Sequence, residues 1–230
     1  MSGFVRFPRT PHLALLGSVD VRDDKVMSPE AARAFLDEEL HVEEKVDGEN
    51  LGLSVVDGRL VAQSRGSYVE LGGQSFRGLA AWLDPRASRI AGELGQDLIL
   101  FGEWCAVRHS VPYDALPDWL LVFDVYDHRI QGFWQLDERD LLADALGLSR
   151  VPRLAEGRFD LAKLQRLLGS SRFGDTPMEG LVLRHAERPE ERAKLVRPEF
   201  LQAIDEHWRS QPVELNRLAG LNPRGQRERV

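Results

Sequence analysis

The sequence predicts an α+β domain whose strands pair mostly in the antiparallel sense. Three observations favour this class. Its strand-like apolar runs are short, the helical patterns between them do not alternate strictly with strands, and Asp57-Gly58 joins two runs as a tight hairpin. The chain has 230 residues, 43% of them hydrophobic, which is enough for a substantial core. No internal repeat or low-complexity linker divides it.

The first helix is predicted from Ser28 to about Leu40. Ser28 can cap its first turn, Pro29 suits the first helical position, and Glu30 adds an acidic group there. Further helices are expected over residues 75–94, with an interruption near Pro85, and over 137–146, 159–168 and 199–209.

Strand-like segments occupy much of the remaining chain, and the glycine-rich polar stretch 66–75 predicts a loop. One domain is expected over 1–209, including an N-terminal extension of short strand and loop over 1–27, followed by a short basic tail over 210–230. The arginine-rich end, 222–230, is expected to fray. The predicted strands are 41–46, 51–56, 60–64, 98–104, 119–126, 178–184 and 193–196.

Composition excludes several classes of protein. A formal net charge of -7 and a pI near 5.5 argue against a general nucleic-acid coat protein. The single cysteine, Cys105, cannot form an intramolecular disulfide and is expected as a buried small hydrophobe. No apolar run is long enough to span a bilayer, and the N-terminus lacks a signal-peptide core, so a cytoplasmic location without membrane contact is expected. The histidines lack metal-ligand spacing, so no zinc site is expected.

Lysine is scarce, because only four of the 30 basic side chains are lysine: Lys25, Lys45, Lys163 and Lys194. Acidic residues outnumber basic ones over 1–183, whereas basic residues are in slight excess over 184–230, where a polynucleotide could track. Arg9 and His12 could also contact a phosphate, although a solvated N-terminal segment is the favoured interpretation.

Lys45 ends a predicted strand, just before Asp47-Gly48. The string Val56-Asp57-Gly58 repeats this pattern without lysine and is interpreted as a turn only. Taken alone, the first copy could also be a charged hairpin. Other motifs in the sequence strengthen a functional interpretation. Charged residues recur at the edges of later apolar strands, as expected of a cleft between facing sheets. These strings are Ser64-Arg65-Gly66, Phe101-Gly102-Glu103-Trp104, Val122-Phe123-Asp124-Val125, Glu179-Gly180-Leu181-Val182 and Lys194-Leu195-Val196-Arg197.

This ordered set, between about Glu43 and Phe200, resembles the covalent nucleotidyltransferases, which comprise ATP-dependent RNA and DNA ligases and mRNA capping enzymes. It looks closest to the RNA ligases that seal nicks in duplexes. Six motifs occur in the family's order, with Arg65 twenty residues after Lys45 and an aromatic twenty residues after Glu103. The resemblance implies a ligase-type nucleotidyltransferase domain, in which antiparallel sheets flanked by helices enclose a central nucleotide cleft.

The resemblance also implies the reaction. Lys45 would attack the α-phosphate of ATP, expel pyrophosphate and hold AMP as a phosphoramidate. AMP would pass to a 5′-phosphate of RNA or of a nicked duplex, and a 3′-hydroxyl would then displace it. Lysine suits this role because its amine can lose a proton, whereas arginine stays protonated. We expect the pKa of Lys45 to be lowered by Mg²⁺ (or Mn²⁺), by Lys194 and by partial desolvation.

Five side chains are implied as contacts of the nucleotide besides Lys45 and the final two motifs. Glu44 would meet the adenine edge or orient the site, and Asn50 the ribose or a phosphate. Arg65 would bind the phosphates or ribose. Glu103 would hold the ribose hydroxyls, and Phe123 would stack on adenine.

The last two motifs supply the remaining roles that the resemblance implies. Glu179 would bind the metal directly or through its water shell, and Lys194 would neutralise the α-phosphate oxygens. The family commonly carries a second lysine two residues after Lys194, where this chain has Val196. Either Arg192 pairs with Lys194, or Lys194 works with Arg197.

Two departures keep alternatives open. Asp47 stands where nick-sealing RNA ligases usually carry histidine and is nearer to the DNA-ligase form, so a DNA nick ligase is one alternative. Too few residues follow Arg197 for the OB-fold of DNA ligases and capping enzymes, so no OB-fold domain is expected. The chain is then either a minimal ligase or a non-joining nucleotide- or nucleic-acid-binding domain that relies on a partner, such as an end-healing kinase or phosphatase. The choice of ATP over GTP rests on the resemblance, and the natural RNA end stays open.

Overall fold

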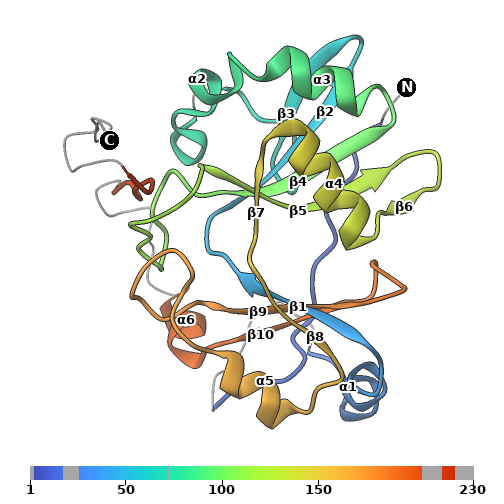
Figure 1. Ribbon diagram of the computed structural model, residues 1–230, viewed down its shortest axis with the longest axis vertical. Coiled ribbons are helices and arrows are strands. Elements are labelled where there is room, and N and C mark those ends of the chain that lie inside the picture. Colours follow the sequence, from blue (N-terminus) through green and yellow to red (C-terminus); the bar gives the residue numbers. More distant parts are fainter. Residues whose placement is uncertain (1–2, 18–25, 72, 204–213, 221–230) are drawn as a thin grey trace.

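Two β-sheets form the framework of the protein and lie one above the other in the computed structural model (Figure 1), which describes residues 3–17, 26–71, 73–203 and 214–220. Sheet A is the lower sheet in that view. Its strands run in the order β10-β9-β1-β8, and each neighbouring pair is antiparallel. They are β1 (Leu40–Lys45), β8 (Arg153–Gly157), β9 (Gly180–His185) and β10 (Arg192–Val196).

Sheet B is the upper sheet, with the antiparallel order β3-β2-β4-β5-β6, and β7 pairs with β5 in parallel. This mostly antiparallel arrangement flanked by helices confirms the α+β prediction. The strands are β2 (Glu49–Val56), β3 (Arg59–Gln63), β4 (Leu98–Trp104), β5 (Leu120–Asp127), β6 (Gly132–Phe133) and β7 (Ser149–Arg150).

The chain crosses between the sheets twice in the described strands. It leaves sheet A after β1, enters sheet B at β2, and returns between β7 and β8 (Figure 1). The first crossing falls on Val46–Gly48, directly after Lys45. Lys45 therefore stands at the point where the two halves of the fold meet.

Helices cover the outer faces of the sheets (Figure 1), and each sheet shares an apolar core with its own helices. Beside sheet B lie η1 (Gln74–Phe76), α2 (Leu79–Leu83), α3 (Ala87–Leu94) and α4 (Leu136–Leu146). Beside sheet A lie α1 (Pro29–Leu36), α5 (Leu161–Leu167) and α6 (Pro198–Ala203).

Two of the predicted helices have different boundaries in the structure. The Ser28 side chain caps α1 as predicted, but the helix ends at Leu36, because Leu40 is fully buried as a strand residue of sheet A. The predicted helix over 75–94 is three pieces, since Gly78 adopts a left-handed φ of 82° and Pro85 offers no N–H to a continuous helix.

Strand β8 was not predicted, because its residues are exposed or half-buried and show no apolar alternation. Its pairing with β1, more than one hundred residues earlier in the sequence, holds it in sheet A.

At the C-terminal end, part of the predicted helix over 199–209 and the predicted frayed end at 222–230 lie outside the described residues. Of the predicted tail, 214–220 packs against the domain. The buried Asn216 accepts a hydrogen bond from the N–H of Tyr113 at 2.9 Å and donates to the carbonyl of Cys105 at 2.8 Å. Cys105 itself is fully buried, and burial raises the pKa of its thiol well above the usual value. Among the helices that the structure describes, none has the length and apolar character needed to cross a bilayer.

Candidate active site

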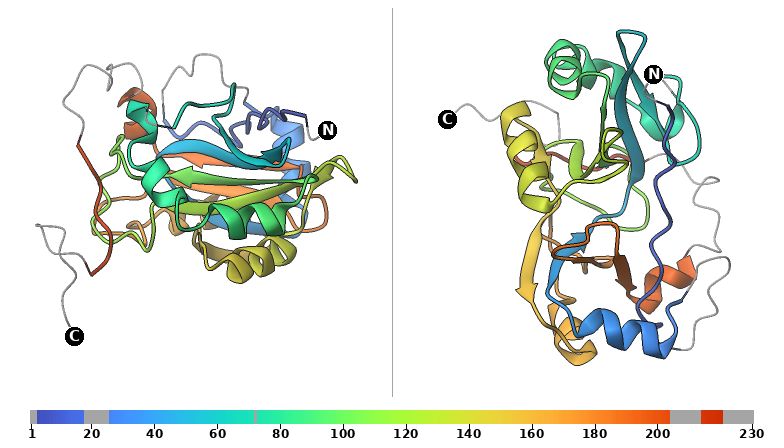
Figure 2. Two further views of the ribbon diagram at one scale, coloured as in Figure 1. Left: turned by 90° about the horizontal axis from the view of Figure 1, so that it is seen from above. Right: turned by 90° about the vertical axis from the view of Figure 1, so that its right-hand side faces the viewer.

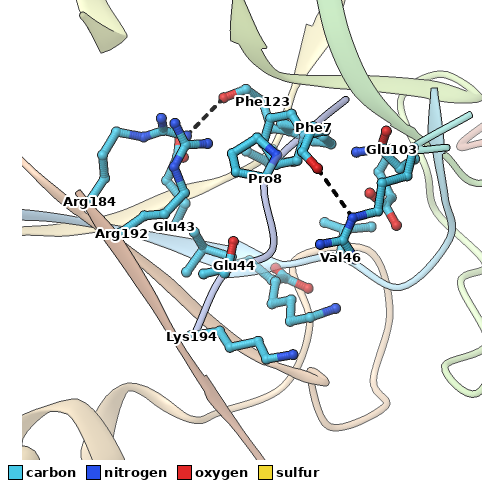
Figure 3. Close-up of a pocket in the computed structure, with 16 residues that line it drawn as sticks. Phe7, Pro8, Glu43, Glu44, Val46, Glu103, Phe123, Arg184, Arg192 and Lys194 are labelled. Carbon is cyan, nitrogen blue, oxygen red and sulfur yellow. Dashed lines mark hydrogen bonds between the residues drawn. The ribbon is translucent and has the colours of Figure 1, made fainter. Parts of the chain in front are cut away.

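A cavity of about 250 Å³ lies between the two sheets (Figure 3). Sheet A, sheet B and the N-terminal segment all contribute to its walls. Every nucleotide-site residue inferred from the sequence, except Glu179, lines it. The lining residues are Phe7, Pro8, Thr10, Glu43, Glu44, Lys45, Val46, Asn50, Arg65, Glu103, Phe123, Val151, Val182, Arg184, Arg192 and Lys194.

The register of sheet A explains why its charged residues meet in this cavity. Glu43 pairs with Val182, which in turn pairs with Lys194, so these residues form one row across three strands. Because side chains alternate along a strand, Lys45 and Lys194 share the face that looks into the cavity. Gly180 occupies the row of Lys45 and lets β10 approach closely, since a Cβ there would lie 2.3 Å from the Leu195 carbonyl oxygen.

Lys45 and Glu179 form an ion pair, with the Lys45 Nζ 2.6 Å from Oε2 of Glu179. Glu179 lies just before β9, opposite the end of β1. Burial alone would lower the pKa of Lys45, but the charges of Glu179, Glu103 and Asp47 outweigh it and hold this pKa above its usual value. The lowering of the Lys45 pKa that was expected from the sequence therefore does not come from the protein's own side chains. Lys45 rests as a protonated, paired amine.

For the carboxyl groups around Lys45, burial outweighs the favourable charge of Lys45, so their pKa values rise. Burial, reinforced by the charge of Asp47, raises the pKa of Glu103 to about 8, and Lys45 opposes this only in part. The same balance raises the pKa of Glu179 to about 7. Three acids thus surround one lysine, and a bound cation would favour their ionised forms.

The crossing after Lys45 is held by its own residues. The Asp47 carboxylate accepts hydrogen bonds from the backbone N–H groups of Ser110 at 2.6 Å and Val111 at 2.9 Å. The N–H of Gly48 donates to Oε1 of Glu103 at 3.1 Å. A side chain at Gly48 would meet the Trp104 carbonyl oxygen at 2.6 Å, so only glycine fits this passage. Asp47 is therefore a structural anchor of the loop.

Glu44 lines the cavity, but its carboxylate is already engaged. It accepts a hydrogen bond from the Ser171 hydroxyl at 2.5 Å and another from the N–H of Arg172 at 2.9 Å, and it is fully buried. Burial raises its pKa despite these bonds. A contact between this carboxylate and an adenine edge would require the bonds to break. The geometry favours the expected orienting role of Glu44 over base contact.

The sheet B side of the cavity presents Asn50, Glu103 and Phe123, since Asn50 and Glu103 are paired neighbours on β2 and β4. The Asn50 Oδ1 is buried and has no hydrogen-bond partner within the described structure. The Phe123 ring meets the ring of Phe7 edge-on, at 5.2 Å between centroids and 69° between planes. Arg65 donates from Nε to the Phe7 carbonyl oxygen at 3.3 Å.

The two arginines that flank Lys194 in sequence separate clearly. Arg192 shares the Lys194 face of β10 and lines the cavity. Arg197 has the opposite strand parity, and its Nη2 donates to the Leu168 carbonyl oxygen at 2.6 Å. Arg192 is therefore the neighbour that accompanies Lys194 in the cavity.

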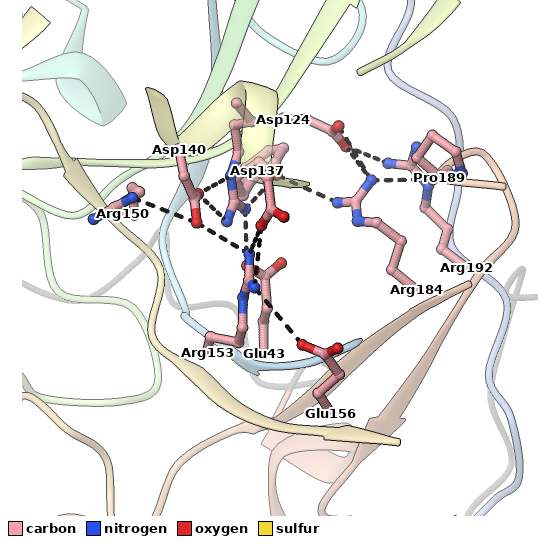
Figure 4. A network of polar contacts seen from close by, with 12 residues as sticks. Glu43, Asp124, Asp137, Asp140, Arg150, Arg153, Glu156, Arg184, Pro189 and Arg192 are labelled. Atoms are coloured by element: carbon pink, nitrogen blue, oxygen red, sulfur yellow. Dashed lines mark hydrogen bonds and ion pairs between the residues drawn. The ribbon is translucent and has the colours of Figure 1, made fainter. Parts of the chain in front are cut away.

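Sequence reasoning missed two groups of cavity residues. The first is the N-terminal segment, where Phe7 is buried and Pro8 and Thr10 line the wall. The second belongs to a buried network between the sheets, of which only Arg192 was a candidate: Asp124 binds both Arg184 and Arg192, while Arg139 binds Glu43 at 2.8 Å (Figure 4). A charge inside an apolar strand, such as Asp124 within β5, was the available signal for the second group.

Together, the two-sheet fold and the paired lysine in its cleft define a nucleotidyltransferase-type domain. A model of the RNA ligase family matches residues 38–196, and the chain belongs to that family. The resemblance inferred from the motifs is thereby confirmed. No curated protein sequence matches the chain significantly.

Similar solved structures come from the Naegleria gruberi RNA ligase. A mutant of that ligase with ATP and Mn has a TM-score of 0.60 and 18% sequence identity, over 74% of this chain and 53% of that chain. Another mutant with AMP and Mn has a TM-score of 0.58 and 16% identity, with the same coverage. The same ligase with PPi has a TM-score of 0.58 and 17% identity, over 74% of this chain and 52% of that chain. This chain thus spans about half the length of those ligases, and the likeness shows the fold.

Proposed function

We propose that the chain is an ATP-dependent RNA ligase that works through a lysyl-AMP intermediate on Lys45. The observation that carries this proposal is the ion pair of Glu179 with Lys45, which lines the inter-sheet cavity together with Lys194. Family membership and the ATP, AMP and PPi complexes of the Naegleria gruberi ligase support a nucleotide in this cavity.

In the first step, the Lys45 nitrogen attacks the α-phosphorus of ATP. The N–P bond forms, the bond to the β-phosphate oxygen breaks, and pyrophosphate leaves. Lys45 must first lose a proton, and Oε2 of Glu179 is within hydrogen-bond reach to receive it. Lys194, which lies two residue rows from Lys45 on the same face of sheet A, supplies positive charge for the α-phosphate oxygens.

In the two later steps, AMP moves to the RNA and then departs. A 5′-phosphate oxygen attacks the phosphorus held on Lys45, which breaks the N–P bond and caps the RNA end with AMP. A 3′-hydroxyl then attacks the RNA phosphate, forms the phosphodiester bond and releases AMP. The released amine takes the proton back from Glu179 and re-forms the ion pair, which resets the site.

A divalent cation, Mg²⁺ or Mn²⁺, fits the acid-rich side of the cavity. Glu179 is the proposed ligand, and Asp47 adds negative charge near it. Glu103, whose pKa is raised to about 8, would ionise as the charge of a bound cation lowered that pKa. No group of three metal-ligating side chains converges within the described residues, so phosphate oxygens of the nucleotide would complete the coordination. The bound metal would supply charge neutralisation at the transferring phosphate.

RNA is the proposed substrate because the family model is that of RNA ligases. The DNA-ligase-like Asp47 does not oppose this choice, since its carboxylate is occupied by the backbone of Ser110 and Val111. The proposed substrates are RNA or nicked duplexes with 5′-phosphate and 3′-hydroxyl ends. An end-healing partner protein, and action in the cytoplasm, complete the proposal.

The test is self-adenylylation with α-³²P-labelled ATP and Mg²⁺. We expect an acid-labile labelled band for the wild type and none for Lys45→Ala. Lys163→Ala is the matched control, because Lys163 is an exposed lysine on α5, away from the cavity. Equal labelling of Lys45→Ala and wild type would refute the assignment of Lys45 as the nucleophile.

A joining assay then separates the ligase from its alternatives. Nicks with a ribonucleotide 3′-hydroxyl should be sealed faster than all-DNA nicks. Labelling without joining on either nick would favour the alternative in which the chain depends on a partner for sealing.

A further inference from the structure

The N-terminal segment, residues 3–14, runs past both sheets (Figures 1 and 2), and its residues Phe7, Pro8 and Thr10 line the cavity. On the sheet B side, the Gln63 side chain donates a hydrogen bond to the Val5 carbonyl oxygen at 2.8 Å. The Arg65 side chain donates in the same way to the carbonyl oxygen of Phe7, two residues further along the segment. On the sheet A side, the N–H of Lys194 donates to the Pro11 carbonyl oxygen at 2.9 Å. His12, expected in a solvated segment, is fully buried beside β10.

The extended upper part of this segment has an inner and an outer face. Val5 and Phe7 point inward and pack with the buried residues Ile99 and Phe101 of β4. Phe4 and Arg6 alternate with them and are exposed. The inner face therefore explains how the segment is held, while the outer face has no part in that packing.

The outer face continues onto the loop after β3. The exposed ring of Tyr68 meets the ring of Phe4 edge-on, with centroids 5.4 Å apart, and the two side chains are 47% and 36% exposed. The Arg6 guanidinium lies against Gly66 of the same loop, 3.7 Å from where a Cβ would stand. We call Phe4, Arg6 and Tyr68 the aromatic–arginine surface.

The charge around this surface opposes that of the whole molecule. The two segments that build it, 4–9 and 64–71, contain three arginines and one acid, whereas the chain has a net charge of -7. The surface also adjoins the cavity, since Phe7 and Arg65, which line the cavity, belong to the same two segments. A ligand on this surface could thus reach the cavity past Arg6 and Arg65.

We propose that the aromatic–arginine surface binds a single-stranded stretch of the RNA substrate next to the end being joined. Exposed aromatic rings beside arginines are the chemistry that holds single strands, because unpaired bases stack on the rings and phosphates pair with the guanidinium groups. This inference rests on the proposed function for the identity of the polymer. It assigns the N-terminal segment two roles, a cavity wall on one side and a strand guide on the other.

The test is binding of a fluorescently labelled single-stranded RNA with a 5′-phosphate to the full chain, measured by anisotropy without ATP. The double variant Phe4→Ala/Tyr68→Ala should bind about tenfold more weakly. Tyr68→Phe, which keeps the ring, should bind like the wild type, whereas Tyr68→Leu should not. The matched control is Ile130→Ala/Leu141→Ala, which removes two exposed apolar side chains of sheet B's periphery.

Salt dependence tests the arginine separately. Arg6→Gln should reduce the slope of log affinity against log salt by about 0.7, the value for one phosphate contact on a single strand. Arg33→Gln, on the exposed side of α1, should leave the slope unchanged.

Self-adenylylation of the same variants keeps the two proposals apart. Ring-dependent RNA binding by a wild type that cannot label itself would overturn the ligase mechanism and uphold the strand surface. Normal labelling with equal RNA affinity in wild type, Phe4→Ala/Tyr68→Ala and Tyr68→Leu would overturn the surface and uphold the mechanism. Ring dependence seen only with a fully paired duplex would also overturn the assignment to single strands.

Discussion

Asp124 of sheet B and Arg184 of sheet A are joined by a two-pronged ion pair, in which Nη1 of the arginine lies 3.1 and 3.0 Å from the two carboxylate oxygens. Arg192 adds a third bond to the same carboxylate at 2.5 Å (Figure 4). All three side chains are buried. Since Arg184 lies four residues along β9 from the Lys45 row, this pair ties the sheets together at the far end of the cavity.

Removing the carboxylate should therefore destabilise the whole fold. Asp124→Asn leaves two buried guanidinium groups without their counter-charge, and we expect the free energy of unfolding to fall by about 3–5 kcal/mol. Urea unfolding followed by circular dichroism measures it. Glu191→Gln, which breaks the exposed pair with Arg188, should cost less than about 1 kcal/mol. Similar losses in the two variants would show that the buried pair does not hold the sheets.

Gly180 should tolerate no side chain. In Gly180→Ala the new methyl would collide with backbone atoms of Leu195 and Val196, so β9 and β10 must separate beside Glu179. We expect at least about 2 kcal/mol of destabilisation and loss of self-adenylylation. Gly92→Ala is the control, because Gly92 lies in α3 with open space around it, and alanine there should stabilise the helix by up to about 1 kcal/mol. A soluble, fully active Gly180→Ala protein would contradict this account of the close strand approach.

Lys194 and Arg197 should differ sharply in kinetic effect. Lys194→Ala removes a positive charge from the cavity, and we expect adenylylation to slow by about 10²–10³-fold. Arg197→Ala removes a bond to Leu168 outside the cavity and should change the rate by less than about threefold. Single-turnover labelling at saturating ATP measures both rates. Equal effects would place Arg197 in the phosphate site.

Removal of the Phe123 ring should weaken ATP binding. Phe123→Leu keeps an apolar side chain but removes the ring expected to stack on adenine, so half-maximal labelling should need about tenfold more ATP. Phe123→Tyr should retain the wild-type value. Phe133→Leu is the packing control, because Phe133 also packs against Phe7, at 5.6 Å, without lining the cavity. Comparable shifts in Phe123→Leu and Phe133→Leu would point to packing of Phe7 as the cause.

Acid stability should depend on Asp127. Hydrogen bonds from Arg129 lower the pKa of Asp127 to about 2. A carboxyl group whose pKa is lowered in the folded state contributes its full stabilisation when the pH is above its unfolded pKa of about 3.9. This stabilisation is lost as the pH falls towards 2. Asp127→Asn should therefore cost about 1–3 kcal/mol at pH 7 and about half as much at pH 3, where the native carboxylate is still ionised. Urea midpoints at both pH values test this, with Glu93→Gln, an exposed carboxylate of α3, as the control. A loss of the same size at both pH values would rule out the ionised pair as its source.

Local signals in the sequence predicted most of the strands and the start of α1. The Ser28 cap and the short apolar runs act within a few residues, so they can be recognised without the rest of the fold. The end of α1 could not be placed this way, because the strand that follows it is fixed by the pairing of Leu40 with His185, more than one hundred residues later. β8 has no apolar pattern of its own and exists only because β1 lies beside it.

The same division applies to the candidate site. Lys45, Glu103 and Lys194 were found because each is a charged residue at the edge of an apolar strand and each stands at a motif position. Phe7 was not found, since its place against Phe123 depends on a segment crossing both sheets. The engaged carboxylate of Glu44 was equally hidden, because Ser171 comes more than one hundred residues later. Long-range partners decide which motif side chains stay available for a ligand.

The double crossing between the sheets bears on how the molecule folds. β1 and β8 are neighbours in sheet A, yet all of sheet B, residues 49–150, is inserted between them in the sequence. If sheet A formed first, folding would have to meet the entropic cost of closing a loop of about one hundred disordered residues. We therefore expect sheet B and its helices to collapse first and bring the two ends of the insertion together. β1 would dock afterwards, so Lys45 would meet Glu179 only at the end of folding. A nascent or half-folded chain would then hold no assembled site in which to consume ATP.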